Sequence, residues 1–508
     1  MSANPITPPD TSDDGANKSR LKPGAIGLVG VVFMVVAFSA PTTAMTGNLP
    51  VAVGFGNGIG APASFMIATV VLTIFSVGFV ALARHITAAG AFYTFVSRGW
   101  SKIPGLAAGV MSMVTYMTME AGLIGIFSIF SKQAFDAQFG LDLAWQIYAL
   151  VALLVIAILS HFDISVAAKV LGLVLVLEIA VLAGTAFTVL FKGGGPDGII
   201  WEAVNPLTAL STNDVAGGVI GLGLLMAFWS WVGFESTAIY GEESKDPKRI
   251  VPQATMIAVI GIGVFYTFIS WMTVSANGAD KSVELASGAA PFELLYTPTR
   301  VFVGEWAVTA FEWLVVFGSF ACALAIHNSA ARYLFAFGRD RLLWHKMGEA
   351  HPQHASPYIA SMVQSSFAAL LLIVCWVTDA DPYATLFVLV AILATICLLI
   401  VQIMCSISAI VYFHVKKEHP ETANWWRTLT APILGAFGMG FVTYLMLSNM
   451  EAAAGAASDT LFFKLIPWIV VALLFGSMLV SAMLKQRRPD MYARIGSTVF
   501  DDVHDTVV

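Results

Sequence analysis

Two stretches of the 508-residue chain decide its fold: VVAFSAPTTAMTGNLPV at residues 35–51 and GLGLLMAFWSWVGFESTAIYGEE at residues 221–243. Each belongs to an apolar block long enough to cross a membrane as a helix, and each is interrupted in the middle. The interruption of the first stretch consists of Ser39, Ala40, Pro41, Thr42 and Thr43. The second is interrupted by Gly233 and a carboxylic acid, Glu235. Because proline lacks an N–H and hydroxyls can satisfy freed carbonyls, we expect both helices to be broken there.

The composition is that of a membrane protein. Hydrophobic residues make up 58% of the chain and charged residues only 11%, whereas soluble proteins carry about 25% charged residues. The net charge of −6 is spread over tails and loops without a basic stripe, which excludes nucleic acid as a partner. The four cysteines lie inside apolar blocks without C-x-x-C spacing, so we interpret them as small buried side chains.

The charge pattern predicts twelve membrane spans and their orientation. If twelve apolar blocks all cross the membrane, 21 of the 26 Lys and Arg residues fall on the side of the two termini. A missed span would exchange the sides of all later loops and blur this asymmetry. By the positive-inside rule both termini are cytoplasmic, and the protein is a multi-pass protein of the cell membrane. The outer loop 276–303 is expected to hold short helices, and loop 84–102 is expected to lie at the membrane interface.

Each break has a structural alternative to a binding role. Pro41 can be a simple kink, which is common in membrane helices. Glu235 is at membrane depth, where an acid is costly unless it is paired, protonated or faces a wet cavity, so it is a functional candidate. The alternative is a protonated Glu235 that hydrogen-bonds a neighbouring helix. The same stretch contains the aromatic residues Trp229, Trp231 and Phe234. Their rings suit a cationic or apolar group of a substrate, and the alternative is that they serve ordinary helix or lipid packing.

The segment WSWVGFESTAIYGEESKDPKRIVPQAT (229–255) resembles the sixth span and following loop of the amino acid/polyamine/organocation (APC) permeases. NSAARYLFAFGRDRLL (328–343) and TAAGAFYTFVSRGW (87–100) are similar to two further segments of that family. The resemblance implies an all-α, LeuT-like fold of 12 transmembrane helices with a 5+5 inverted repeat and broken helices 1 and 6. The implied organisation is a disordered cytoplasmic tail at 1–23, a first repeat at 24–191, a second repeat at 192–414, two further helices at 415–484 and a cytoplasmic tail at 485–508.

The resemblance also implies roles for the residues at the two breaks. Trp229 would face the substrate, and Glu235 would act in substrate binding or gating. In relatives that bind α-amino acids, N–H groups of a Gly-rich first break receive the substrate carboxylate, as helix N-termini receive anions generally. This chain departs from that pattern, since it has Ser-Ala-Pro-Thr-Thr and Pro41 removes one donor. The departure favours an amine or polyamine substrate.

The fifth span departs from the family at a position linked to coupling. Matching KVLGLVLVLE (169–178) without gaps places Glu178 where sodium-independent relatives often carry a lysine. A carboxylate cannot imitate a bound cation, but it can bind a cation or take up a proton. We therefore predict Glu178 as the coupling residue, with a neutral Glu178 that ties the fifth helix to the first or eighth as the alternative. Ser319 is a further candidate, either as a cation ligand or as a packing residue.

A third acid is expected mid-span in the third helix. Glu120 follows Tyr116 by one turn, so the two are predicted to line the cavity wall, or Glu120 is a partner for another helix. His327 is expected to be a core histidine that bonds a carbonyl.

The expected function is that of a secondary transporter rather than an enzyme. There is no Walker lysine, HExxH or GxSxG motif, and we predict no catalytic residues, cofactor or metal. The expected partners are an amino acid or amine substrate, a proton in preference to sodium as coupling ion, and membrane lipid. Two alternatives stay open: a polyamine or amino-alcohol exchanger or uniporter, and a sensor that binds its ligand without moving it. The sequence leaves the oligomeric state open.

Overall fold

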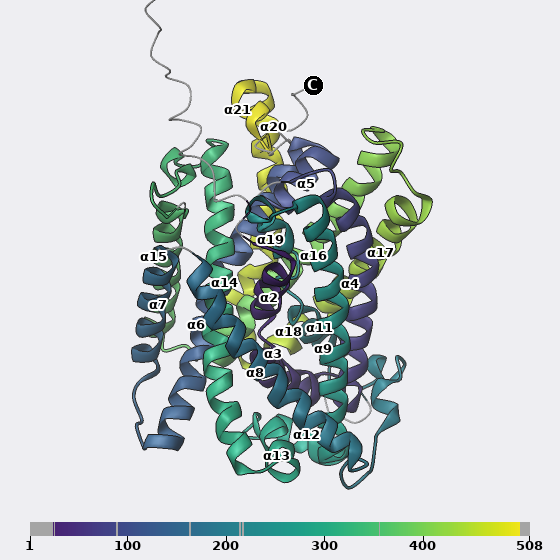
Figure 1. The fold of residues 1–508 in the computed structure, drawn as a ribbon, viewed down its shortest axis with the longest axis vertical. Helices are drawn as coiled ribbons and strands as arrows, with labels where there is room; N and C mark the ends of the chain where they lie inside the picture. The colour runs from purple at the N-terminus through teal and green to yellow at the C-terminus, as the bar shows by residue number, and fades with distance from the viewer. Residues whose placement is uncertain are drawn as a thin grey trace, which may run out of the picture.

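The computed structural model describes residue 24 and residues 26–497, apart from residues 88–89, 162–163, 213–214, 216–217 and 355. Helices make up most of this part of the chain, and it contains no strand. The expected tail at 1–23 lies outside the described residues, as does the end of the expected tail at 485–508. The helices run largely side by side (Figure 1).

The helices of the first third of the chain are α2 (Leu28–Ser39), α3 (Pro41–Val51), α4 (Ala61–Ala83), α5 (Phe92–Gly99), α6 (Lys102–Phe139), α7 (Trp145–His161) and α8 (Ile164–Phe191). They are followed by α9 (Ile220–Trp229), α10 (Ser236–Ile239), α11 (Pro247–Asn277), α12 (Ala279–Ser287), α13 (Glu293–Phe302), α14 (Glu305–Arg339), α15 (Tyr358–Val377) and α16 (Val388–Ile410). The last helices are α17 (Ala431–Ser448), α18 (Met450–Ala454), α19 (Leu461–Val471), α20 (Ser477–Arg487) and α21 (Pro489–Arg494). Short π-helical segments include η1 (Ala52–Asn57) and η7 (Pro382–Phe387).

Within the described residues, nine helical segments are long and apolar enough to cross a membrane. One of them, Leu28–Ala83, contains the three helices α2, α3 and α4. Two shorter apolar helices, Trp145–His161 and Ile220–Trp229, add to these nine. The all-α, multi-pass membrane fold is therefore confirmed, while the number twelve and the inverted repeat stay predictions.

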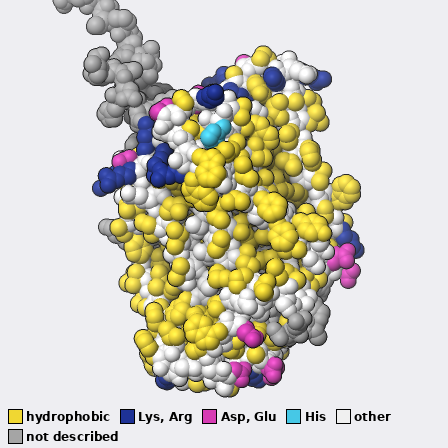
Figure 2. Space-filling model, turned by 90° about the vertical axis from the view of Figure 1, so that its right-hand side faces the viewer, with side chains coloured by type: hydrophobic (Ala, Val, Ile, Leu, Met, Phe, Trp, Pro, Cys, Tyr) yellow, Lys and Arg dark blue, Asp and Glu magenta, His cyan; other side chains and the backbone are white. Residues whose placement is uncertain are grey.

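The outer surface suits a lipid environment. Large apolar side chains face outward along the waist of the molecule, for example Phe437 with 75% and Trp468 with 71% of their surface exposed. Most Lys and Arg side chains visible in Figure 2 gather at its upper end. Because nothing in water would stabilise so wide an apolar belt, this surface is the one that hydrocarbon covers.

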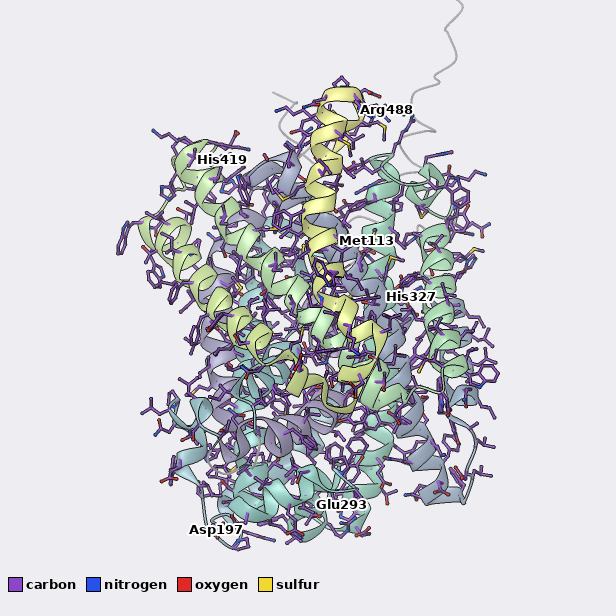
Figure 3. The ribbon with its side chains drawn as sticks, turned by 180° about the vertical axis from the view of Figure 1, so that it is seen from behind. Met113, Asp197, Glu293, His327, His419 and Arg488 are labelled. Carbon is purple, nitrogen blue, oxygen red and sulfur yellow. The ribbon has the colours of Figure 1, made fainter. Side chains whose placement is uncertain are left out.

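The two ends of the molecule carry the loops that the charge pattern separates. His419 and Arg488 lie at one end and Asp197 and Glu293 at the other, with His327 between them (Figure 3). The outer loop 276–303 holds α12 and α13, as predicted. Loop 84–102 holds α5, most of whose residues are buried, and α5 packs on α6 and α16. Its expected position at the membrane interface stays a prediction.

The middle of the bundle holds the two interrupted stretches. Helices α2 and α3 lie at the centre of the view in Figure 1. Helix α2 packs on α8, α11 and α14, and α3 packs on α9 and α14. The breaks are therefore enclosed by other helices, which is the condition under which non-helical backbone is tolerated at membrane depth.

Candidate functional site

The first break is narrower than the sequence indicates. Helix α2 ends at Ser39, Ala40 adopts a left-handed backbone with φ 39°, and α3 begins at Pro41. Proline is well tolerated at the first position of a helix, where its missing N–H would have no partner in any case. The interruption is thus the single residue Ala40, and Thr42 and Thr43 belong to the first turn of α3.

The carbonyls freed at the end of α2 are satisfied by two side chains that the sequence analysis did not single out. The Cys322 thiol donates to the Phe38 carbonyl oxygen at 2.8 Å, and the Tyr266 hydroxyl donates to that of Ser39 at 2.8 Å. Of the hydroxyls expected in this role, Ser39 donates to Val35 O at 3.2 Å inside the helix. No local motif reveals Cys322 or Tyr266, because both reach the break from other helices, α14 and α11.

The second break contacts the first. Helix α9 ends at Trp229, a short turn follows, and α10 begins at Ser236. In that turn Gly233 has φ 109°, and a methyl group built on it would overlap the ring of Phe38. A glycine is therefore required for two reasons, the left-handed backbone and the close approach of the α2 ring.

Glu235 is fully buried and hydrogen-bonded through both carboxylate oxygens. Oε1 accepts a hydrogen bond from the Tyr116 hydroxyl at 2.6 Å, and Oε2 accepts one from the Gly233 N–H at 3.1 Å. The Tyr116 ring stacks on Tyr333 and meets Phe38 edge-on. Glu235 thus joins α6 to the second break, and its carboxylate stands at the start of α10.

Glu178 reaches the first break from α8. Its Oε2 accepts hydrogen bonds from the Thr42 N–H at 3.2 Å and the Thr42 hydroxyl at 2.8 Å. A methyl group built on Gly318 of α14 would come within 2.5 Å of Glu178 Oε1, so the carboxylate also lies against the eighth span. Ser319, the next residue, donates to Val316 O in its own helix at 3.0 Å.

Glu120 belongs to a separate buried cluster. Its Oε2 lies 3.0 Å from His327 Nδ1 and accepts from Gln364 Nε2 at 2.6 Å, while His327 Nε2 lies 2.7 Å from Ser361 Oγ. Glu120 and His327 are completely buried. The expectation that His327 bonds a carbonyl was wrong, because the structure pairs it with a carboxylate. Glu120 therefore has partners on α14 and α15.

A small pocket lies between the two breaks. It is lined by Phe38, Ser39, Ala40, Thr43, Ala44, Asn48, Met119, Leu123, Trp229, Ser230, Val232, Cys322, Ile326 and Phe387. Four predicted site residues are among them, Ser39, Ala40, Thr43 and Trp229. No charged side chain belongs to this lining as far as the structure describes it.

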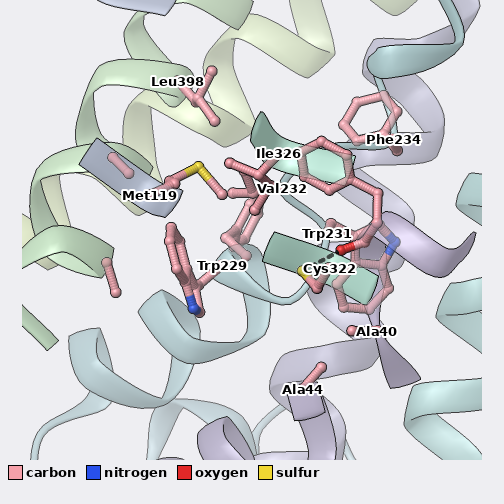
Figure 4. Packing of buried hydrophobic residues seen from close by; sticks show 14 of the residues in the cluster. Ala40, Ala44, Met119, Trp229, Trp231, Val232, Phe234, Cys322, Ile326 and Leu398 are labelled. Atoms are coloured by element: carbon pink, nitrogen blue, oxygen red, sulfur yellow. Dashed lines mark hydrogen bonds between the residues drawn. The ribbon is translucent and has the colours of Figure 1, made fainter. Parts of the chain in front are cut away.

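The other predicted aromatic residues point elsewhere. Trp231 packs near Phe65 and Tyr266, and Phe234 packs near Phe75 and Phe79. In Figure 4 Trp229 lies beside Met119, whereas Trp231 lies on the opposite side of Cys322. Of the two tryptophans at the second break, Trp229 therefore lines the pocket and Trp231 packs in the core.

Several lining residues were not predicted. Phe38, Asn48, Ser230 and Val232 sit inside the two quoted stretches, so their proximity to the breaks was an available signal. Met119, Ile326 and Phe387 come from α6, α14 and η7 and carry no motif. Across the described residues, no group of three or more His, Cys, Asp or Glu side chains could hold a metal ion.

Two broken helices in a membrane bundle, with a pocket between their ends, are also the arrangement of secondary transporters that bind their substrate at interrupted helices. The family model for amino acid permeases matches residues 26–475, and the chain belongs to that family. The resemblance to APC permeases is thereby confirmed, and the protein is a transporter rather than an enzyme.

Individual relatives are distant. The chain is 23% identical to the low-affinity putrescine importer PlaP of Escherichia coli K12, over 81% of this chain and 86% of PlaP. It is 24% identical to the branched-chain amino acid permease BcaP of Bacillus subtilis, over 46% of each chain, so less than half of BcaP is matched. The serine/threonine exchanger SteT of Bacillus subtilis is 22% identical over 60% of this chain and 65% of SteT.

A solved structure shares the fold. Mhp1, a nucleobase-cation-symport-1 family transporter solved in a closed conformation with bromovinylhydantoin bound, superimposes with a TM-score of 0.51 at 12% identity. The match covers 94% of this chain and 98% of Mhp1. This likeness confirms the predicted LeuT-like fold class.

Proposed function

We propose that the protein moves amino acids or related organic amines across the cytoplasmic membrane by alternating access. The observation that carries this proposal is the pocket to which both breaks contribute, with Ala40 from the first and Ser230 and Val232 from the second. A solute held there contacts both interrupted helices at once. It can therefore favour an occluded state over the open states, and that difference in affinity is what drives alternating access.

The proposed energy source is a proton gradient or exchange against another solute, with Glu178 as the proton carrier. Its carboxylate contacts the first turn of α3 and lies against α14, so a change in its charge acts directly on the first break. Protonation removes the negative charge that now attracts the Thr42 donors. A proton is proposed in preference to sodium because a carboxylate takes up a proton without any further ligand, whereas sodium needs several oxygen ligands.

The proposed gate is the contact between Tyr116 and Glu235. It lies behind Phe38, whose ring both lines the pocket and meets Tyr116. We place both termini in the cytoplasm from the Lys and Arg distribution, with repeats at 24–191 and 192–414. On this arrangement each repeat begins with a broken helix.

Uptake into proteoliposomes tests the function. Radiolabelled amino acids and amines are offered with and without an inward-acid pH gradient, to wild type and Glu178→Gln, beside protein-free vesicles. Gradient-stimulated uptake that the variant loses supports proton coupling. Uptake or exchange without gradient dependence in wild type refutes proton coupling and leaves transport intact. Binding without flux under any gradient or counter-substrate refutes transport and supports a sensor.

A further inference from the structure

The pocket offers hydrogen-bond acceptors without partners. Asn48 Nδ2 donates to Ser230 Oγ at 2.8 Å, and Ser230 Oγ donates to Met226 O at 2.8 Å. Because the only hydroxyl hydrogen of Ser230 is used on Met226, the Asn48 end that faces Ser230 must be the NH₂ group. Asn48 Oδ1 then stays without a partner among the described residues, and so does Thr43 Oγ1.

These two atoms are buried, since Asn48 is 2% and Thr43 is 4% exposed. Asn48 Oδ1 can only accept, whereas the Thr43 hydroxyl both accepts and donates. Because a buried acceptor without a donor is unfavourable, a ligand group that donates hydrogen bonds stabilises this site when it binds. An ammonium group carries three such donors. The polar part of the pocket therefore fits an amine.

The N-terminal end of α3, beside the pocket, already holds a carboxyl group of the protein. The N-terminal end of a helix attracts anions, and α3 presents such an end at the pocket. Pro41 has no N–H there, and both the N–H and the hydroxyl of Thr42 are bonded to Glu178. The Glu178 carboxyl group thus uses the Thr42 donors that a substrate carboxylate would need, and in its ionised form it also repels a second carboxylate.

The helix ends at the pocket also favour a cationic group over an anionic one. Helices α2 and α9 end at Ser39 and Trp229, so both direct their carbonyl ends, which favour cations, toward the pocket. The start of α10 carries the carboxylate of Glu235. The aromatic side chains of Phe38, Trp229 and Phe387 in the wall suit an ammonium group or an apolar body.

We propose that the pocket selects a primary amine with an apolar body and no carboxylate, the decarboxylated counterpart of an apolar amino acid. Glu178 occupies the donors at the start of α3, the helix end that would otherwise attract the carboxylate of an amino acid. This selectivity rests on the proposed transport function and names its substrate class. A diamine is disfavoured, because the lining described here holds no acid for a second ammonium group.

Matched pairs that differ only in the carboxylate test the proposal. Saturable uptake of isoamylamine and leucine, and of isobutylamine and valine, is measured at neutral pH in proteoliposomes of the full chain. Protein-free vesicles correct for passive entry of the amine, and putrescine is included as the diamine. We expect the amine of each pair to be preferred by about ten-fold or more, as charge-assisted hydrogen bonds predict.

Preference for leucine and valine, or for putrescine, overturns the selectivity and leaves the transport function standing. Transport of other solutes with neither member of any pair also overturns it. No saturable uptake of any solute, in a preparation that remains monodisperse, overturns the transport function itself. The failure of one proposal is thus distinguishable from the failure of the other.

Two sets of variants probe the cause. Glu178→Gln replaces the ionisable acceptor of the Thr42 donors with a neutral one. The ratio of leucine affinity to isoamylamine affinity is therefore expected to rise about ten-fold. Glu312→Gln is the control, because Glu312 lies outside the site and contacts Gln138. Thr43→Val removes an acceptor and is expected to raise the Kd for isoamylamine several-fold. Binding to purified protein reports these effects even if Glu178→Gln no longer transports. An unchanged ratio in Glu178→Gln, or unchanged amine affinity in Thr43→Val, overturns the assignment.

Discussion

The Glu178 carboxylate accepts two hydrogen bonds from the single residue Thr42, at 3.2 Å from its N–H and at 2.8 Å from its hydroxyl. The two residues are 136 positions apart, and both are buried. This contact connects α8 to the first turn of α3 and places a carboxylate at a helix N-terminus, where the helix dipole stabilises it.

Thr42→Val removes the hydroxyl bond and keeps the shape of the side chain. Hydrogen bonds to charged groups contribute about 1.5–3 kcal/mol, so gradient-driven uptake is expected to fall at least ten-fold. Initial uptake rates in proteoliposomes measure the change, and Thr188→Val, which removes only an exposed bond to Gly184 O in its own helix, is the control. If both variants keep the wild-type rate, the contact is not part of the transport cycle.

Tyr116→Phe leaves Glu235 Oε1 without the hydroxyl that it now contacts at 2.6 Å. Since Tyr116 does not line the pocket, we expect the maximal transport rate to fall about ten-fold or more while the KM changes little. The matched control is Tyr148→Phe, because the Tyr148 hydroxyl has no hydrogen-bond partner among the described residues. A change confined to KM would instead place Tyr116 in substrate binding.

Gly233→Ala is expected to abolish the folded, active protein. The left-handed backbone at φ 109° costs about 1–3 kcal/mol for a non-glycine residue, and the added methyl group overlaps the Phe38 ring. Gly261→Ala is the control, because nothing lies within 4 Å of its Cβ position in α11. Melting temperature and elution profile in detergent measure the effect, and a Gly233→Ala protein as stable as Gly261→Ala contradicts this account of the break.

His327→Gln is expected to destabilise the protein strongly. Breaking a buried ionisable pair costs about 3–5 kcal/mol, because the remaining carboxylate loses its partner. The exposed pair of His419 and Glu421, at 2.9 Å, supplies the control His419→Gln, whose cost is about 0–1 kcal/mol. Thermal unfolding checks both, and a double-mutant cycle with Glu120→Gln measures the coupling. Equal melting temperatures for the two histidine variants would show that the buried cluster of Glu120, His327 and Gln364 does not stabilise the fold.

The membrane fold, the family and both breaks follow from local features of the chain. Apolar blocks longer than a bilayer needs must cross it as helices, and Pro41 and Gly233 interrupt two of them where backbone conformation demands it. These features are encoded within a few consecutive residues, so the sequence alone suffices to predict them. The same local information marked Ser39, Ala40, Thr43 and Trp229 at the pocket.

Which side chain meets which was decided by packing between distant helices. Trp229 and Trp231 are two residues apart, yet the rotation of the chain in the turn after α9 directs one to the pocket and the other to the core. Cys322 and Tyr266 reach the first break, and His327 reaches Glu120, from helices more than a hundred residues away. A buried polar group needs a hydrogen-bond partner, and the tertiary packing determines which residue supplies it. The spacing of residues in the sequence does not predict that residue.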